Sequence, residues 1–160
     1  MPGDAAQSAK TLLTGARYGV LSTLMRSHQP GWPMGSLAPF ALTSRGEPLF
    51  AFSALAEHTK NVLADPRASL FVLAAAAAGA PAQDPEASPQ ASPRVTLLGT
   101  LRRAADDAAP GLRARYLDAH PEAARLFALD FSLWVLEVAE ARFIGGFGAA
   151  AWIPGADLSR

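Results

Sequence analysis

Residues 48–73, PLFAFSALAEHTKNVLADPRASLFVL, decide the fold that this sequence predicts. Leu49 to Ser53 begins with an apolar run and reads as a strand, and Ala56 to Ala64 reads as a short helix. Asp65-Pro66-Arg67 breaks that helix, and a second apolar run extends from Ala68 to Leu73. The pattern therefore predicts a strand, a polar corner, a helix and another strand.

The polar corner gathers side chains that can donate hydrogen bonds: Ser53, His58, Thr59, Lys60 and Asn61. We expect the Ser53 hydroxyl to cap the helix. Free amides and a partial positive charge at a helix N-terminus favour an anion, so the corner is a candidate seat for a phosphate or a carboxylate. The simpler interpretation of this stretch alone is a capped surface helix with solvated polar residues, since it has no glycine-rich cradle.

The composition indicates one domain with an ordinary core. A chain of 160 residues buries roughly two-thirds of its unfolded surface. Lys plus Arg and Asp plus Glu number 14 each, so nothing in the charge balance favours nucleic acid or an anionic membrane as a partner. The absence of cysteine excludes disulfides and thiolate chemistry. With no signal-peptide pattern and no apolar run of membrane-spanning length, we expect a cytoplasmic protein.

Outside residues 48–73 the pattern predicts a sheet with inserted helices. Most connections between the expected strands are short, which favours an antiparallel sheet closed into a small barrel. Residues 74–93 hold four prolines and little that can pack, so we expect a mobile loop there. The other expected elements are strands at 18–25, 36–43, 94–102, 132–138 and 142–147, helices at 4–16 (capped by Asp4) and 108–119, and a short helix from Pro121 to Leu126.

A series of short motifs extends along most of the chain. In order they are Gly35-Ser36, Ser53-x-Leu55-x-x-His58-Thr59-x-Asn61, Asp65-Pro66-Arg67-x-Ser69-Leu70, Pro93-Arg94-x-Thr96-Leu97-x-Gly99, Tyr116-x-x-x-His120-Pro121 and Gly145-Gly146-Phe147-Gly148. Together they resemble the pyridoxamine 5′-phosphate oxidase-like proteins of the FMN-binding split-barrel superfamily, and most closely the branch named for haem iron utilisation. The resemblance implies a mainly β fold, a six-stranded antiparallel split barrel with inserted helices. It also implies a homodimer with FMN in two clefts at the interface.

The resemblance also implies a set of cofactor-binding residues. Positions 35–38 match the strand that runs along the flavin, 51–53 match a neighbouring strand end, His58 and Thr59 match a phosphate contact, and Arg94 matches a position that reaches the flavin from the partner side. With the polar residues of the corner, the candidate FMN site comprises Gly35, Ser36, Leu37, Ala38, Ala51, Phe52, Ser53, His58, Thr59, Lys60, Asn61 and Arg94.

Some positions depart from the authentic oxidases. Gly35 stands where they carry Arg, and Glu57-His58 stands where they carry Arg-Lys. The C-terminal Arg and His with which they hold pyridoxal phosphate have no counterpart here, so pyridoxamine phosphate is not the expected substrate. No catalytic residue is assigned, and no pair of histidines has the spacing of a metal site.

Three functions follow from these observations. The first is an FMN-dependent oxidoreductase of unknown substrate, in which the flavin supplies the redox chemistry. The second is a haem-binding or haem-degrading protein on the same barrel, with His28 or His120 as an axial ligand if neutral. The third is a non-catalytic carrier of FMN or another small ligand. A short tail without histidine favours the flavin over the haem interpretation.

Overall fold

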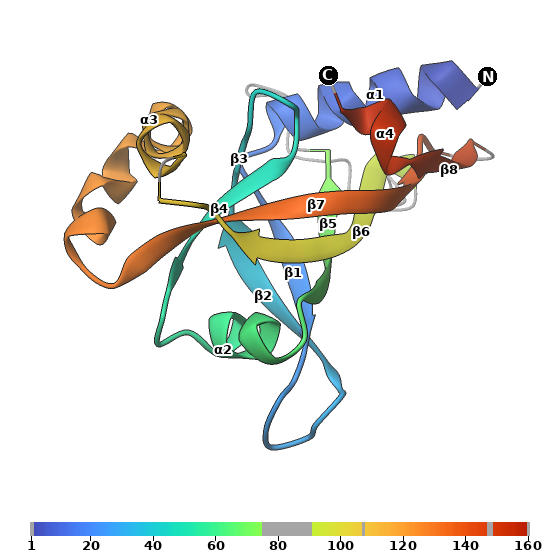
Figure 1. The fold of residues 1–160 in the computed structure, drawn as a ribbon. Helices are drawn as coiled ribbons and strands as arrows, with labels where there is room; N and C mark the ends of the chain where they lie inside the picture. Colours follow the sequence, from blue (N-terminus) through green and yellow to red (C-terminus); the bar gives the residue numbers. More distant parts are fainter. Residues whose placement is uncertain (1, 75–90, 107, 147–148, 160) are drawn as a thin grey trace.

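An antiparallel sheet forms the body of the molecule in a computed structural model that describes residues 2–74, 91–106, 108–146 and 149–159 (Figure 1). Its strands follow the order β2-β1-β5-β6-β7-β4-β3, and β8 pairs with β7. The strands are β1 (Tyr18–Leu24), β2 (Pro33–Pro39), β3 (Ala41–Leu42), β4 (Pro48–Ser53), β5 (Arg67–Leu73), β6 (Arg94–Arg103), β7 (Phe131–Ile144) and β8 (Ala150–Pro154).

The sheet curls around one apolar core. Alternate residues of its strands, including Leu21, Leu70 and Leu97, are fully buried on the concave side. Phe40 alone separates β2 from β3, which stand at opposite ends of the strand order, and its ring centroid lies 6.2 Å from that of Phe50 inside the curl. The sheet therefore closes on itself as a half-barrel, which confirms the mainly β, split-barrel expectation.

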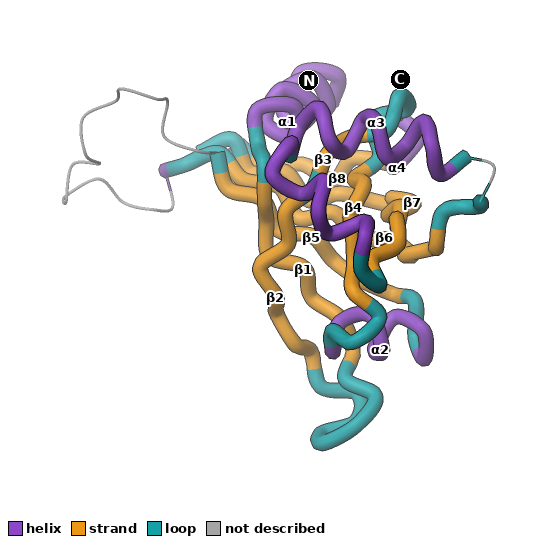
Figure 2. Tube along the Cα trace, turned by 90° about the vertical axis from the view of Figure 1, so that its left-hand side faces the viewer, coloured by secondary structure: helices purple, strands orange, loops and turns teal. Residues whose placement is uncertain are grey.

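Helices cover the two ends and one flank of the half-barrel (Figures 1 and 2). Helix α1 (Pro2–Gly15) packs beside the short α4 (Gly155–Leu158) at one end, and α2 (Glu57–Ala64) lies at the other. Helix α3 (Ala109–Ala119) and the 3₁₀ helix η2 (Pro121–Ala128) cover the flank, where they bury a second apolar cluster that includes Tyr116 and Leu133.

Two of the expected strands are one continuous strand. Residues 132–138 and 142–147 were expected to be separate, but β7 continues from Phe131 to Ile144. Its first part pairs with β4 and its last part with β8, while β6 follows nearly its whole length. Strand β8 lies in the stretch that was expected to be an irregular tail. Pairing on both sides therefore outweighs the weak strand propensity of the Ala139-Glu140-Ala141 stretch.

Other boundaries also differ from expectation. The strand expected at 36–43 begins earlier, at Pro33, and breaks at Phe40, whose side chain turns into the core and whose N–H donates to the Arg17 carbonyl (2.9 Å). The helix after His120 is 3₁₀, and Asp4 lies within the first turn of α1 instead of capping it. Most of the loop expected at 74–93 lies outside the described residues.

Candidate functional site

The polar corner between β4 and α2 is organised by a carboxylate from a distant part of the chain. The Ser53 hydroxyl donates to Asp130 Oδ2 (2.7 Å) and accepts from the Leu55 amide (3.1 Å). The hydrogen bond from Ser53, helped by the amides of Leu55 and Ala54, lowers the pKa of Asp130. Ser53 does not cap the helix as expected, because Ala56 is the N-cap and makes no side-chain bond. The chain itself thus supplies an anion at the corner.

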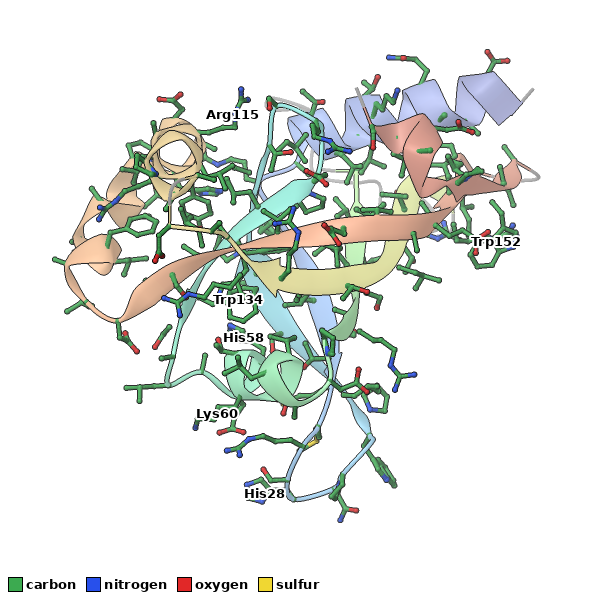
Figure 3. The ribbon with its side chains drawn as sticks, viewed as in Figure 1. His28, His58, Lys60, Arg115, Trp134 and Trp152 are labelled. Carbon is green, nitrogen blue, oxygen red and sulfur yellow. The ribbon has the colours of Figure 1, made fainter. Side chains whose placement is uncertain are left out.

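The first turn of α2 carries two buried polar atoms without a partner. The His58 ring meets Phe52 edge-on, with centroids 4.5 Å apart, and its side chain points toward the sheet near Trp134 (Figure 3). His58 Nε2 and Thr59 Oγ1 are buried and make no hydrogen bond. Burial lowers the pKa of His58, so its imidazole is neutral at neutral pH. A neutral ring fits a charge-assisted phosphate contact less well than the sequence suggested.

The other two polar residues of α2 are engaged with the protein. Lys60 Nζ lies 2.7 Å from Glu57 Oε1, and its side chain points away from the sheet. Asn61 is buried; its Nδ2 donates to Thr23 Oγ1 and its Oδ1 accepts from the Arg26 amide, both at 3.1 Å. Asn61 therefore fastens α2 to β1, and its amide is already bonded at both ends.

The candidate residues of β2 divide between two sides of the sheet. Gly35 and Leu37 lie on the convex side, which we call the outer face and define by Val20, Leu37, Phe71 and Leu98, all at least partly exposed. Ser36 pairs with the fully buried Leu21 and, like the buried Ala38, faces the core.

The candidate residues of β4 and β6 are also dispersed. Phe52 faces the barrel core, whereas Ala51 packs against the cluster under α3. Arg94 lies on the same side of β6 as Thr96, the partner of Phe71 on the outer face. Ser53 pairs with Phe131 and Arg94 with Ile144, at opposite ends of β7. At about 3.3 Å per residue these ends lie roughly 40 Å apart along the strand. One chain therefore does not bring Arg94 to the corner.

The outer face contains a hollow of about 420 Å³. Ser22, Ser69 and Leu98 line it and stand in one cross-strand row, and Gly35 extends this row onto β2. Arg67 also lines the hollow, and its guanidinium pairs with both oxygens of Asp65 (Nη2 to Oδ2, 2.6 Å). These hydrogen bonds lower the pKa of Asp65 to about 2. The hollow thus combines small side chains, apolar surface and a fixed cation.

The histidines outside the corner differ sharply in environment. His120 Nε2 lies 2.9 Å from the Phe40 carbonyl oxygen and Nδ1 lies 3.4 Å from Glu122 Oε1, inside the protein. The expectation that His120 is available as an axial ligand is therefore wrong for this structure. His28 is exposed in the turn between β1 and β2, where its φ is 61° (Figure 3). The described residues contain no cluster of three potential metal ligands of the His, Cys, Asp and Glu types.

Sequence reasoning missed Asp130 and the residues of the hollow. Asp130 lies 77 positions after Ser53, beyond the reach of a local motif. Ser22 and Ser69 are short polar residues in apolar strands, and alternation with buried neighbours could have assigned both to the outer face.

A family profile described as the CREG beta-barrel matches residues 2–159. The chain belongs to the CREG beta-barrel family. This assignment and the relatives described next confirm the resemblance seen in the sequence, and a structure from the pyridoxinephosphate oxidase family in Clostridium acetobutylicum shares the fold at 10% identity with a TM-score of 0.68.

Two relatives are about one-third identical to this family member over the aligned residues. A chloroplastic heme oxygenase, HOZ, from Arabidopsis thaliana is 32% identical over 144 residues, which cover 90% of this chain and 41% of the relative. The structure of a heme binding protein from Mycobacterium smegmatis is 35% identical with a TM-score of 0.84, covering 96% of this chain and 59% of that one. This chain therefore spans only about two-fifths to three-fifths of the length of these relatives.

More distant structures share the fold. ChuZ from Campylobacter jejuni superposes with a TM-score of 0.75 at 19% identity, covering 98% of this chain and 61% of that one. Within the described residues, no helix has both the length and the apolar character needed to cross a membrane.

Proposed function

We propose that this protein binds haem on the outer face of its sheet. The observation that carries the proposal is the hollow beside Leu98, with Arg67 fixed at its lining and further apolar side chains on the adjoining strands. Haem needs an apolar surface for its ring and cations for its propionates. The two relatives that are about one-third identical over the aligned residues, one named as a heme binding protein and one as a heme oxygenase, support the same ligand.

The residues present fit the ring and the propionates of haem. Val20, Phe71 and Leu98 offer apolar contact, and Arg94 lies farther along the face. The guanidinium of Arg67 is already paired with Asp65, so a propionate would share it with that carboxylate. A guanidinium matches a carboxylate in shape and charge. Haem iron supplies oxygen and redox chemistry when bound, and the described residues that line the hollow include no histidine. These side chains would hold the haem ring and its propionates and would keep water away from the face of the ring.

FMN is the less well supported ligand. Its phosphate was expected at the corner, where Asp130 takes the hydrogen bond of Ser53 and Glu57 takes the charge of Lys60. An incoming phosphate would have to displace Asp130 from Ser53 and compete with Glu57 for the ammonium group of Lys60. Haem makes no demand on the corner, although its propionate would share Arg67 with Asp65.

We further propose that two copies of the chain associate through the outer face. Leu37 is 71% exposed on β2, and Val20 and Phe71 continue the apolar surface next to it. Apolar side chains that adjoin in this way mark interaction surfaces. A second copy that packs on this face would enclose the hollow.

Titration by absorption spectroscopy tests haem binding. Haem added to the protein should give a Soret band that saturates, and Ser69→Trp, which fills the hollow, should weaken binding at least tenfold. Leu63→Trp is the matched control, because Leu63 is exposed on α2 and does not line the hollow. A titration with no saturable Soret change, or equal affinity for both variants, would refute the proposed site. Saturable binding of FMN without haem binding would restore the flavin interpretation.

Haem degradation is a second candidate because one relative is named as an oxygenase. Haem-loaded protein given ascorbate and oxygen should lose its Soret band faster than free haem does if the protein degrades haem. An unchanged band limits the function to binding.

A further inference from the structure

A second hollow, of about 550 Å³, lies between α3, η2 and the adjoining ends of β6 and β7. It shares no lining residue with the hollow of the outer face. Ala104 and Leu133 are buried at its base, Leu117 of α3 lines one side, and the rings of Phe127 and Phe131 complete its apolar part. Its volume is typical of a site for a small organic molecule, for which roughly 300–1,000 Å³ is usual.

Two guanidinium groups stand over this apolar base. Arg113 of α3 places its Cζ 4.4 Å from the centroid of the Phe127 ring, and Arg103 reaches the same hollow from the end of β6. In the part of the chain that the structure describes, neither arginine forms an ion pair with a carboxylate. Asp106 also lines the hollow, so its described residues carry one positive charge in excess.

We propose that this second hollow binds an amphipathic monocarboxylate, with its apolar body on Leu117 and Leu133 and its carboxylate between Arg103 and Arg113. The planar fork of a guanidinium donates paired hydrogen bonds to the two oxygens of a carboxylate. Stacking on Phe127 already restrains Arg113, which reduces the ordering that binding requires. A neutral ligand would leave both guanidiniums unpaired, and a small inorganic anion would leave the apolar base uncovered.

Calorimetric titration with octanoate, and with 1-octanol as the uncharged analogue, tests the proposal. Octanoate should bind to the wild-type protein, and 1-octanol should bind at least tenfold more weakly. Arg113→Gln and Arg103→Gln should each weaken octanoate at least tenfold while leaving 1-octanol within about twofold. Arg115→Gln is the matched control, because Arg115 is on the same helix but points away from the sheet and does not line the hollow (Figure 3).

A variant that fills the hollow with a larger side chain distinguishes binding in this hollow from non-specific binding at the surface. Ala114 lines the hollow and is exposed on α3, so Ala114→Phe should block both probes without disturbing the core. No octanoate binding to the wild-type protein, equal affinity for the two probes, or an equal loss in the Arg115→Gln control would overturn the proposal. Displacement of octanoate by one equivalent of haem would also overturn it, because the hollow would then belong to the haem site. If the protein binds octanoate but shows no saturable haem binding, this site stands even though the proposed function does not.

Discussion

At the scale of single residues, the buried ring of His58 in α2 should make the stability of the protein depend on pH. Its pKa is lowered by burial, so the folded state holds the neutral ring while the unfolded state binds a proton near the ordinary value of 6.5. The contribution of His58 to the free energy of unfolding is therefore complete above pH 6.5, and it is lost as the pH falls through the pKa of the folded state. The urea midpoint should fall between pH 7 and pH 5, and His58→Phe should flatten that fall.

Leu63→Phe is the control for this prediction. Leu63 is exposed on the same helix and has no ionisable group, so an aromatic ring there should leave the pH dependence of the urea midpoint unchanged. A His58→Phe variant with the pH profile of the wild type would show that other groups cause the loss.

The residues of the corner also show how far the sequence predicts a site. The polar character of Ser53 and His58 and their place beside a helix start were evident from the motif. Ser53 and His58 have roles other than the predicted ones. Asp130, far along the chain, accepts the Ser53 hydrogen bond, and the ring of His58 packs against Phe52. Local spacing reports which groups are near one another, whereas their partners depend on tertiary contacts.

At the scale of elements, Asn61 is the main polar connection between α2 and β1. Asn61→Ala removes two buried hydrogen bonds and leaves Thr23 Oγ1 without its donor. At about 0.5–1.5 kcal/mol for each bond, with a further penalty for the stranded hydroxyl, the loss should reach about 2–3 kcal/mol in urea unfolding. Lys60→Ala on the same helix should cost much less, since it removes a partly exposed ion pair. Equal losses would show that the hydrogen bonds of Asn61 contribute no more to stability than the partly exposed ion pair of Lys60.

Two glycines provide a matched test of the sheet and of α3. A Cβ at Gly99 would come within 2.2 Å of the Glu137 carbonyl oxygen, beside the irregular pairing at Leu98, whereas one at Gly111 meets no atom within 4 Å. Gly99→Ala should destabilise the protein by about 1–3 kcal/mol through overpacking. Gly111→Ala should stabilise it by about 0.5–1 kcal/mol, because alanine is the better residue in a helix interior. Thermal unfolding measures both, and changes of the same sign would contradict the geometry.

The elements most strongly marked in the sequence formed nearly where they were expected. Strands β4, β5 and β6 and helices α2 and α3 shift by at most a residue or so at either end. The continuous β7 was missed because Ala139 and Ala141 have low strand propensity and only the pairing with β6 and β8 holds them extended. Strand β8 was missed because a run as short as AAWIP has little pattern of its own.

At the scale of the whole molecule, the half-barrel leaves one face of its sheet uncovered. Helices α1, α2 and α3 occupy the two ends and one flank, while Val20, Leu37, Phe71 and Leu98 remain open to solvent. Among the predicted FMN residues, Gly35, Leu37 and Arg94 share this outer face. If a second copy covers the face as proposed, these three residues would lie at the interface.

The association of two copies can be tested without disturbing the core. Leu37 is 71% exposed on the outer face and Leu63 is 70% exposed on α2, so replacing either with Lys changes little within one chain. If the outer face joins two copies, Leu37→Lys buries a charge in their interface and should raise the dissociation constant at least tenfold. Leu63→Lys should leave it unchanged. Sedimentation velocity at micromolar concentration measures both, with haem absent and present. A stable monomer in the wild-type protein would remove the second copy from the proposal, and haem binding by that monomer would place the ligand on an open face.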